Sequence, residues 1–243
     1  MMVRMIKIIV ITWLLALHAF ALLAVWDTDL PYRIDRKLGL GLLNPPEITL
    51  LYEDMLGSHL QLDGSVMQGS IIFLGDSLTQ GLNVAAVANA SINYGIGMDT
   101  SWGLLKRVPQ YKSLNRASTI VIAIGINDLL RTSRSPADIV KNYQHILSRL
   151  PKGKAILIQA AFPADEEISG LTGINQTIFQ LNKMLHQLAK ERDYQFVNLW
   201  EQFTKNDGSA KKELYIEDGL HLSTKGYQLW IQALKQHLSS KRD

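Results

Sequence analysis

A serine, an aspartate and a histidine lie in two short stretches of the sequence where they could perform acyl-transfer chemistry. In "IIFLGDSLTQGL" (Ile71 to Leu82), Ser77 follows an apolar run that ends in Gly-Asp. A serine hydroxyl is a weak nucleophile until a base takes its proton, and the base needs an acid that orients it. "DGLHLSTKGY" supplies both groups, because a spacing of three lets Asp218 reach one ring nitrogen of His221 while the other nitrogen faces outward.

The other five histidines lack such a setting. They fall in helical patterns beside polar residues, in a linking region, or in an apolar N-terminal run, and we interpret them as surface or packing residues. They are His145, His186, His237, His59 and His18.

Acyl transfer creates a negatively charged oxygen, and two further loops offer hydrogen-bond donors for it. Gly95 in "INYGIGMDT" offers a backbone N–H without side-chain hindrance, and Asn127 in "GINDLL" offers a side-chain amide. Together with the N–H of Ser77, these groups could form an oxyanion hole with three donors.

Each of these loops comes after a segment with the pattern of a buried strand, or just before a predicted helix. Apolar segments of this kind are Ser70 to Gly75, Ala90 to Gly95 (a weaker candidate), Thr119 to Gly125, Ala155 to Pro163 and Tyr194 to Trp200. Helical patterns lie between and after them, at Pro136 to Leu150, Gly173 to Arg192 and Ser223 to Leu238. Continuous apolar strands that alternate with helices indicate an α/β fold whose parallel sheet is covered on both faces. Ligands bind beyond the carboxyl ends of such strands, where Ser77 is expected to lie.

Four motifs resemble the sequence blocks of the SGNH hydrolases, also called GDSL esterases or lipases. They are Gly75-Asp76-Ser77-Leu78, the Gly95 loop, Gly125-Ile126-Asn127-Asp128 and Asp218-Gly219-Leu220-His221. All four occur in the order of the family, and the resemblance covers roughly residues 70–238.

The resemblance implies a role for each matching residue. Ser77 would be the nucleophile, His221 the base and Asp218 the residue that orients it, with Ser77, Gly95 and Asn127 forming the oxyanion hole. It also implies a three-layer α/β/α, flavodoxin-like fold with no metal ion and no other cofactor. We interpret the remaining motif carboxylates, Asp76 and Asp128, as residues that stabilise turns or support the catalytic residues from behind, and we consider a direct chemical role the weaker alternative.

Three functions are compatible with these residues. The first is a serine esterase that hydrolyses acyl esters through an acyl-enzyme, and the second is an acyltransferase in which an alcohol replaces water. The third is a catalytically silent, membrane-tethered binding module, which the complete set of catalytic groups argues against. A single apolar run without further membrane spans favours hydrolysis.

The acyl and alcohol parts of the substrate are less well determined. Small acyl esters, lysophospholipids and O-acetylated glycans are all candidates for an enzyme outside the cytoplasm. Apolar residues near the motifs could line an acyl pocket or belong to the core: Ile96, Met98, Ile126, Leu129, Leu220 and Leu222.

Composition and missing motifs exclude several other classes. Apolar residues make up 47% and charged residues 19% of the 243 residues, which is ordinary for a globular protein. Without Arg4 and Lys7, the chain has 23 basic and 22 acidic residues. This near balance gives no strong positive charge for nucleic-acid binding, so no nucleic-acid partner is expected. The sequence has no cysteine, which excludes disulfides and thiolate metal sites. It also lacks G-x-S-x-G, H-E-x-x-H, a Walker A motif and a complete G-x-G-x-x-G.

The N-terminus predicts a membrane association. "IIVITWLLALHAFALLAVW" (Ile8 to Trp26) contains no charged residue other than histidine, and as a helix it would span roughly 28 Å, close to the hydrocarbon thickness of a bilayer. Arg4 and Lys7 precede it and Asp27 and Asp29 follow it, which predicts a cytoplasmic N-terminus and an extracytoplasmic body.

Two main interpretations of this run remain open. It is either an uncleaved anchor or a signal peptide that is cleaved after Ala21 in "AFA". We favour the anchor because the run continues past that site. A buried core helix is a weaker alternative, since the run has no polar face.

The expected organisation has three parts. Residues 1–26 are the signal anchor or signal peptide, residues 27–69 are a linker with a helix at about Pro46 to Leu60, and residues 70–243 are the hydrolase domain. The expected partners are the ester substrate and, through the N-terminal helix, a membrane. The sequence predicts no oligomeric state.

Overall fold

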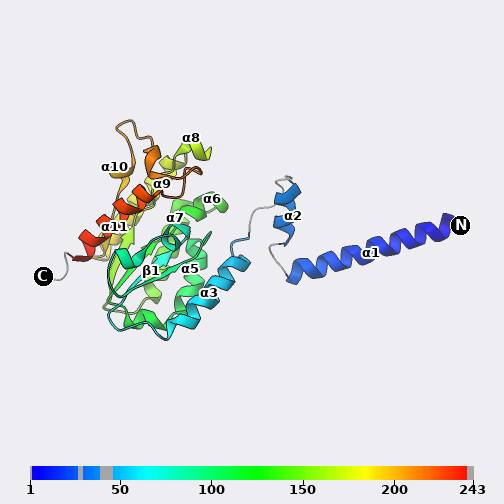
Figure 1. Ribbon diagram of the computed structural model, residues 1–243, viewed down its shortest axis with the longest axis horizontal. Helices are drawn as coiled ribbons and strands as arrows, with labels where there is room; N and C mark the ends of the chain where they lie inside the picture. The colour runs from blue at the N-terminus through cyan, green and yellow to red at the C-terminus, as the bar shows by residue number, and fades with distance from the viewer. Residues whose placement is uncertain (1, 27–29, 39–45, 240–243) are drawn as a thin grey trace.

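The structure is a computed structural model that describes residues 2–26, 30–38 and 46–239 (Figure 1). Its body contains one parallel five-stranded sheet in the order β2-β1-β3-β4-β5. The strands are β1 Ile71–Gly75, β2 Ser91–Gly95, β3 Thr119–Ala123, β4 Ala155–Gln159 and β5 Gln195–Val197. This is the order of flavodoxin-like sheets, and it confirms the fold class predicted from the sequence.

Helices precede and connect the strands. The α-helices are α1 Met2–Trp26, α2 Leu30–Leu38, α3 Leu50–Asp63, α4 Ser77–Gln80, α5 Ser101–Arg107, α6 Ile126–Arg131, α7 Pro136–Arg149, α8 Glu166–Ser169, α9 Ile174–Glu191, α10 Trp200–Phe203 and α11 Thr224–Ser239. Short 3₁₀ segments lie at Val84–Ala86, Val108–Gln110, Lys112–Arg116 and Lys212–Leu214.

Alternate residues of the central strands enter two separate hydrophobic clusters, one on each face of the sheet. Ile72 and Leu74 of β1 pack in a cluster with α5, α7 and α9. Ile71 and Phe73 pack in the other cluster, with α4, α10 and α11. All five residues of β1 are buried, which explains why its sequence is continuously apolar.

The strand register brings the functional loops to one edge. Gly75 at the end of β1 lies beside Gly95 of β2 and Ala123 of β3, so these strands end at the same level. Gly75 has to be glycine, because a Cβ atom there would lie 2.1 Å from the Thr79 hydroxyl and 2.3 Å from the Ala123 carbonyl. The chain can therefore turn sharply from β1 into α4.

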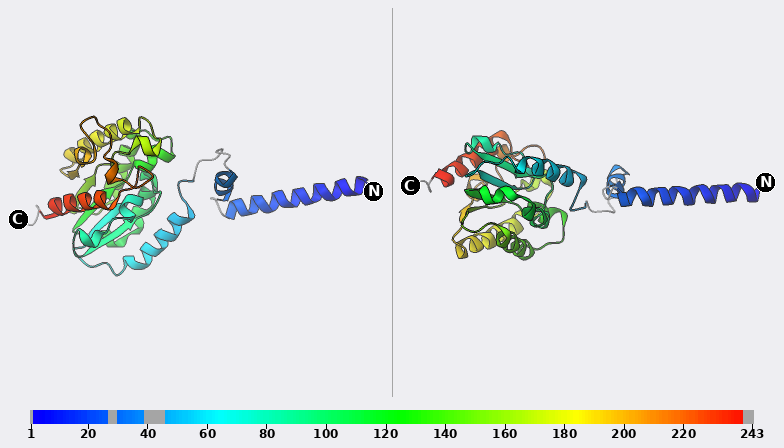
Figure 2. Two further views of the ribbon diagram at one scale, coloured as in Figure 1. Left: turned by 45° about the horizontal axis from the view of Figure 1, so that its top comes forward. Right: turned by 90° about the horizontal axis from the view of Figure 1, so that it is seen from below.

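Helix α1 is apolar along most of its length after Lys7 and extends away from the α/β body (Figures 1 and 2). Residues Arg4–Leu23 are long and apolar enough to cross a membrane, and none of the most apolar window is buried within the structure. The helix is therefore not a core helix of the body. Asp27 and Asp29, on which the predicted topology partly rests, lie outside the described residues.

Helix α3 packs on the body through buried polar side chains. Tyr52 donates its hydroxyl to the Gly103 carbonyl at 2.8 Å, and Asp63 accepts from the Tyr94 hydroxyl at 3.0 Å and from the Ser113 N–H at 3.1 Å. The helix begins after Thr49, whose side chain accepts the Tyr52 N–H, and it therefore starts four residues later than the Pro46 start expected from the sequence. Residues 49–63 are thus held against the α/β body.

Candidate active site

Ser77 is the first residue of α4, directly beyond the end of β1. Asp76 caps this helix, since its carboxylate accepts the Leu78 N–H at 3.0 Å. The Ser77 side chain is partly exposed, and its N–H is a first-turn donor without a partner inside the helix. The turn therefore presents both the hydroxyl and the N–H of Ser77 at the edge of the sheet.

A chain of hydrogen bonds links Ser77 to the loop before α11. The Ser77 hydroxyl lies 2.9 Å from His221 Nε2, and His221 Nδ1 lies 2.6 Å from the Asp218 carboxylate. The turn at Gly219, with φ 68°, lets the same carboxylate accept the N–H groups of Leu220 and His221 at 2.9 and 2.8 Å. The structure thus brings together the serine, histidine and aspartate that the sequence singled out.

Asp218 is held in its charged form. Its partial burial alone would raise the pKa of the carboxyl, but hydrogen bonds from the Leu220 N–H, the His221 ring and the His221 N–H outweigh burial and lower the pKa. A carboxylate at this place fixes the orientation of the imidazole and favours its protonated form during a reaction.

Asn127 lies in the first turn of α6 and is almost completely buried. One of its amide hydrogens goes to the Asp99 carbonyl at 3.0 Å, which leaves the other for a ligand. The neighbouring Asp128 accepts from the N–H and the hydroxyl of Ser101 at 2.7 and 2.6 Å. Asp128 therefore ties α6 to α5.

Gly95 is placed differently from the expectation. Its N–H donates to the side chain of Asn93 at 2.9 Å, so it is not free to bind an oxyanion in this structure. A Cβ atom at Gly95 would lie 2.2 Å from the Gln80 nitrogen. Its lack of a side chain therefore serves the close packing of β2 against α4.

The same loop contains a donor that the sequence did not reveal. Met98 has a φ of 65°, an unusual value for a residue with a side chain, and its N–H has no hydrogen-bond partner among the described residues. The carbonyl of the following residue, Asp99, accepts a hydrogen bond from the Asn127 side chain. The Met98 N–H therefore belongs to the loop that also holds the Asn127 amide, although methionine itself gives no signal for a left-handed backbone.

Arg107 fixes the position of this loop. The fully buried guanidinium donates to the Asp99 carboxylate at 2.8 Å, to the Tyr94 carbonyl at 2.7 Å and to the Gly75 carbonyl at 2.9 Å. It therefore joins the ends of β1 and β2 to the loop that follows β2. Burial raises the pKa of Asp99 to about 6, and the charge of Arg107 opposes this rise. The sequence analysis did not identify this pair.

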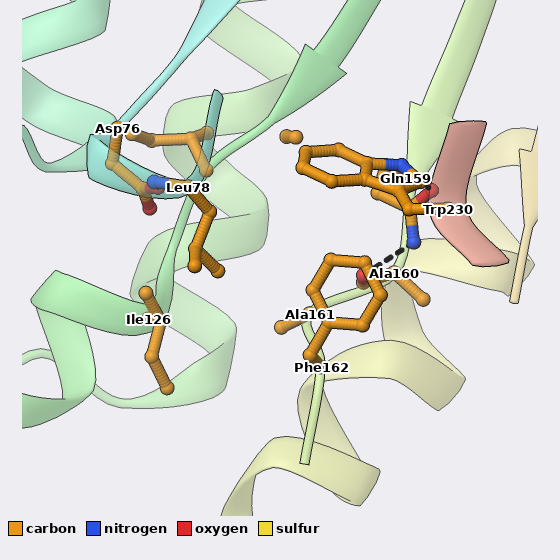
Figure 3. A pocket seen from close by; sticks show the side chains of 10 residues that line it. Asp76, Leu78, Ile126, Gln159, Ala160, Ala161, Phe162 and Trp230 are labelled. Atoms are coloured by element: carbon orange, nitrogen blue, oxygen red, sulfur yellow. Dashed lines mark hydrogen bonds between the residues drawn. The ribbon is translucent and has the colours of Figure 1, made fainter. Parts of the chain in front are cut away.

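A small apolar cavity opens beside the nucleophile, between the carboxyl ends of β1, β3 and β4 and helix α11. Figure 3 shows Leu78 and Ile126 on one side of it and Phe162 and Trp230 on the other. Of the six apolar residues that the sequence offered for a pocket, Ile126 lines this cavity.

Two of the other five, Ile96 and Leu222, are buried in the fold and do not line this cavity. Among the described residues, no group of three or more His, Asp or Glu side chains could hold a metal ion.

Comparisons with known proteins give matches of two kinds. The model of the GDSL-like Lipase/Acylhydrolase family matches residues 73–229. Similar solved structures include a protein from Streptococcus pneumonia named after platelet activating factor, with 24% identity and a TM-score of 0.70 over 77% of this chain and 92% of that chain. No curated protein matches this chain.

Two further solved structures share the fold. A GDSL-like lipase from Bacteroides thetaiotaomicron has 19% identity and a TM-score of 0.67 over 76% of this chain and 97% of that chain. An acetyl xylan esterase has 18% identity and a TM-score of 0.57 over 70% of this chain and 99% of that chain. At these identities the likeness concerns the fold.

Proposed function

The chain belongs to the GDSL-like lipase/acylhydrolase family and is a serine hydrolase of ester bonds, and we propose that it hydrolyses acyl esters outside the cytoplasm through an acyl-enzyme formed on Ser77. The observation that carries this proposal is the hydrogen-bond chain from the Ser77 hydroxyl through His221 to Asp218. Nucleophile, base and orienting acid are then already in contact before a substrate binds.

The first half of the reaction forms the acyl-enzyme. Ser77 Oγ attacks the ester carbonyl carbon while its proton moves to His221 Nε2, and a tetrahedral oxyanion results. The carbon–oxygen bond to the alcohol then breaks, and His221 gives the proton to the leaving oxygen. Asp218 stabilises the imidazolium that exists between these two steps.

The second half releases the acid. Water attacks the acyl carbon while one of its protons moves to His221 Nε2. The bond to Ser77 Oγ then breaks, and the proton returns from His221 to the serine oxygen. The enzyme is restored, and the net reaction consumes one water and one ester to give one alcohol and one acid.

Three donors are available for the oxyanion in this proposal. They are the Ser77 N–H, the second amide hydrogen of Asn127 and the N–H of Met98, which takes the place that we expected for Gly95. Support comes from the hydrogen bond between Gly95 and Asn93 and from the left-handed Met98 backbone. Donors held in place before the reaction stabilise developing charge without reorganising.

The test compares Ser77→Ala with Ser148→Ala, a change at an exposed serine of α7. A fluorophosphonate should label wild type and Ser148→Ala but leave Ser77→Ala unlabelled. Hydrolysis of p-nitrophenyl acetate should fall by several orders of magnitude only in Ser77→Ala. Near-wild-type hydrolysis by Ser77→Ala would refute the assignment. The same assay can be run with an added alcohol. If the ester of that alcohol forms faster than the free acid, the protein is an acyltransferase instead.

A further inference from the structure

We propose that the cavity beside Ser77, lined by Leu78, Ala123, Ile126, Ala161, Phe162 and Trp230, binds the acyl group of the substrate and restricts it to acetyl. This inference rests on the proposed function and makes the protein an acetyl esterase. We refer to this space as the acyl cavity.

The acyl cavity lies next to the reacting groups, although Ser77, Asn127 and His221 do not themselves line it. Its lining includes Asp76 and Leu78, the residues on either side of Ser77, and Ile126, which directly precedes Asn127. In this proposal, a carbonyl carbon attached to Ser77 Oγ, with its oxygen directed at the Asn127 amide, lies at the cavity entrance. One of its two remaining substituents then points into the cavity.

The position of His221 decides which half of the ester enters. His221 Nε2 must protonate the leaving oxygen, so the alcohol has to lie on the histidine side of the carbonyl carbon. No residue of the loop 215–222, which carries Asp218 and His221, lines the acyl cavity. The substituent that enters the cavity is therefore the acyl group.

The lining suits a hydrocarbon group. The two polar side chains of the lining both make hydrogen bonds within the walls. Gln159 accepts from the Trp230 indole at 2.8 Å and donates to the Ala160 carbonyl at 2.9 Å, and Figure 3 shows the second of these bonds. Asp76 accepts from the Leu78 N–H. Burial also raises the pKa of Asp76 to about 7, which favours its neutral form. An apolar methyl group loses no hydrogen bond on entering such a site.

The volume of the cavity sets the length of the acyl group. The space that the centre of a water-sized sphere can reach is about 20 Å³. A cavity needs roughly 10–15 Å³ to hold one water molecule, so this one accepts roughly one or two heavy atoms. The methyl group of acetyl fits within this space, whereas a butyryl or octanoyl chain exceeds it.

The walls are held too firmly to widen at little cost. Asn182 accepts the Ala161 N–H at 2.8 Å and donates to the Ala161 carbonyl at 2.7 Å, which fixes one wall. The Phe162 ring packs against Phe203 and Trp230 at centroid distances of 4.8 and 5.1 Å. Close-packed surroundings of this kind resist an extra methylene group.

The experiment measures kcat/KM of the full-length protein in detergent for p-nitrophenyl acetate, butyrate and octanoate. Wild type should prefer acetate over butyrate by about tenfold or more, because one or two methylene groups in an apolar pocket are worth roughly 10–200-fold. Phe162→Leu widens the cavity and should lower the acetate-to-butyrate ratio by about tenfold. Ala161→Leu fills the cavity and should reduce acetate hydrolysis by about tenfold or more.

Matched substitutions outside the cavity serve as controls. Phe179→Leu changes an exposed ring on α9, and Ala137→Leu changes an exposed alanine on α7. Neither should alter the ratio between acetate and butyrate. Circular dichroism verifies that every variant is folded, and if Phe162→Leu does not fold, Ala161→Leu decides the question.

Two outcomes would overturn the inference while leaving the esterase intact. One is a wild type that hydrolyses octanoate as well as acetate. The other is a pair of folded cavity variants with unchanged acetate kinetics and an unchanged acetate-to-butyrate ratio. Absence of hydrolysis of all three esters by wild type, together with absence of fluorophosphonate labelling, would instead overturn the proposed function.

Discussion

Asp76 links the catalytic turn to the pH dependence of stability. Burial is the main cause that raises its pKa to about 7, with smaller contributions from the nearby Asp99 and Asp128. An unfolded chain has an aspartate pKa of roughly 3.9. Between these two values the folded state binds more protons than the unfolded state, so the free energy of unfolding should fall as the pH rises from about 4 to 7.

Asp76→Asn should therefore weaken this pH dependence. The asparagine carbonyl can still accept the Leu78 N–H, and the residue no longer has to be charged at neutral pH. Urea unfolding at pH 4.5 and 7.5 should show a smaller loss of stability for Asp76→Asn than for wild type or for Asp54→Asn, which changes an exposed carboxylate of α3. Some slope should remain, because the pKa of Asp99 is also raised. Equal slopes in all three proteins would mean that Asp76 is charged in the folded state.

Asn127 is predicted to act on the transition state more than on the bound substrate. Its free amide hydrogen would meet charge that develops only when the tetrahedral intermediate forms, so Asn127→Ala should lower kcat by roughly 10²–10³ with a smaller change in KM. The control is Asn198→Ala, at an exposed position before α10. A variant with unchanged kcat and a raised KM would show that Asn127 binds substrate instead of the oxyanion.

Helix α3 contributes to the body through Asp63. This carboxylate is almost completely buried and accepts the N–H and hydroxyl of Ser113 as well as the Tyr94 hydroxyl. Asp63→Ala would leave these buried donors without an acceptor, at a cost of roughly 1–3 kcal/mol for each unsatisfied group. Asp54→Ala, at an exposed position on the same helix, is the matched control.

Thermal and urea unfolding should therefore separate the two variants by about 2 kcal/mol or more. Equal stabilities would show that α3 is only loosely attached. We propose from these contacts that the folded unit begins before residue 70, within the segment that the sequence analysis treated as a linker.

The sequence predicted those elements whose signal is local. The apolar runs at Ile71–Gly75 and Thr119–Ala123 are strands in the structure, and so is the weaker Ser91–Gly95. The parallel order of these strands then placed the loops of Ser77 and Asn127 at one edge, where the structure has them. Periodicity and strand order thus predict where catalytic side chains gather.

Long-range contacts and backbone details could not be predicted from the sequence. Nothing in the pattern of α3 shows that Asp63 meets Ser113, 50 residues away. The capture of the Gly95 N–H depends on the rotamer of Asn93, and the left-handed backbone of Met98 depends on the loop that Arg107 holds. These features arise from tertiary packing, which residue types and spacing do not specify.

The charges that flank helix α1 predict on which side of a membrane the catalytic body lies. Arg4 and Lys7 precede the apolar run, so we expect the N-terminus to stay in the cytoplasm and the active site to lie outside it. A phosphatase that folds only outside the cytoplasm, fused after Asp243, should be active, whereas a reporter active only inside should be silent. Exchange of both basic residues in Arg4→Glu/Lys7→Glu should reduce the outside signal, because the charge difference across the helix disappears.

The control for that double variant is Lys152→Glu/Lys235→Glu, which makes the same charge change at exposed positions of the body and should leave the topology unaltered.

Fractionation and N-terminal sequencing then distinguish an anchor from a signal peptide. An intact chain in the membrane fraction identifies α1 as an anchor, since an apolar helix of this length remains in the bilayer. A soluble chain that begins at Leu22 identifies cleavage after "AFA". Full-length protein in the soluble cytoplasmic fraction would contradict both interpretations, because the apolar window of α1 is not buried within the structure.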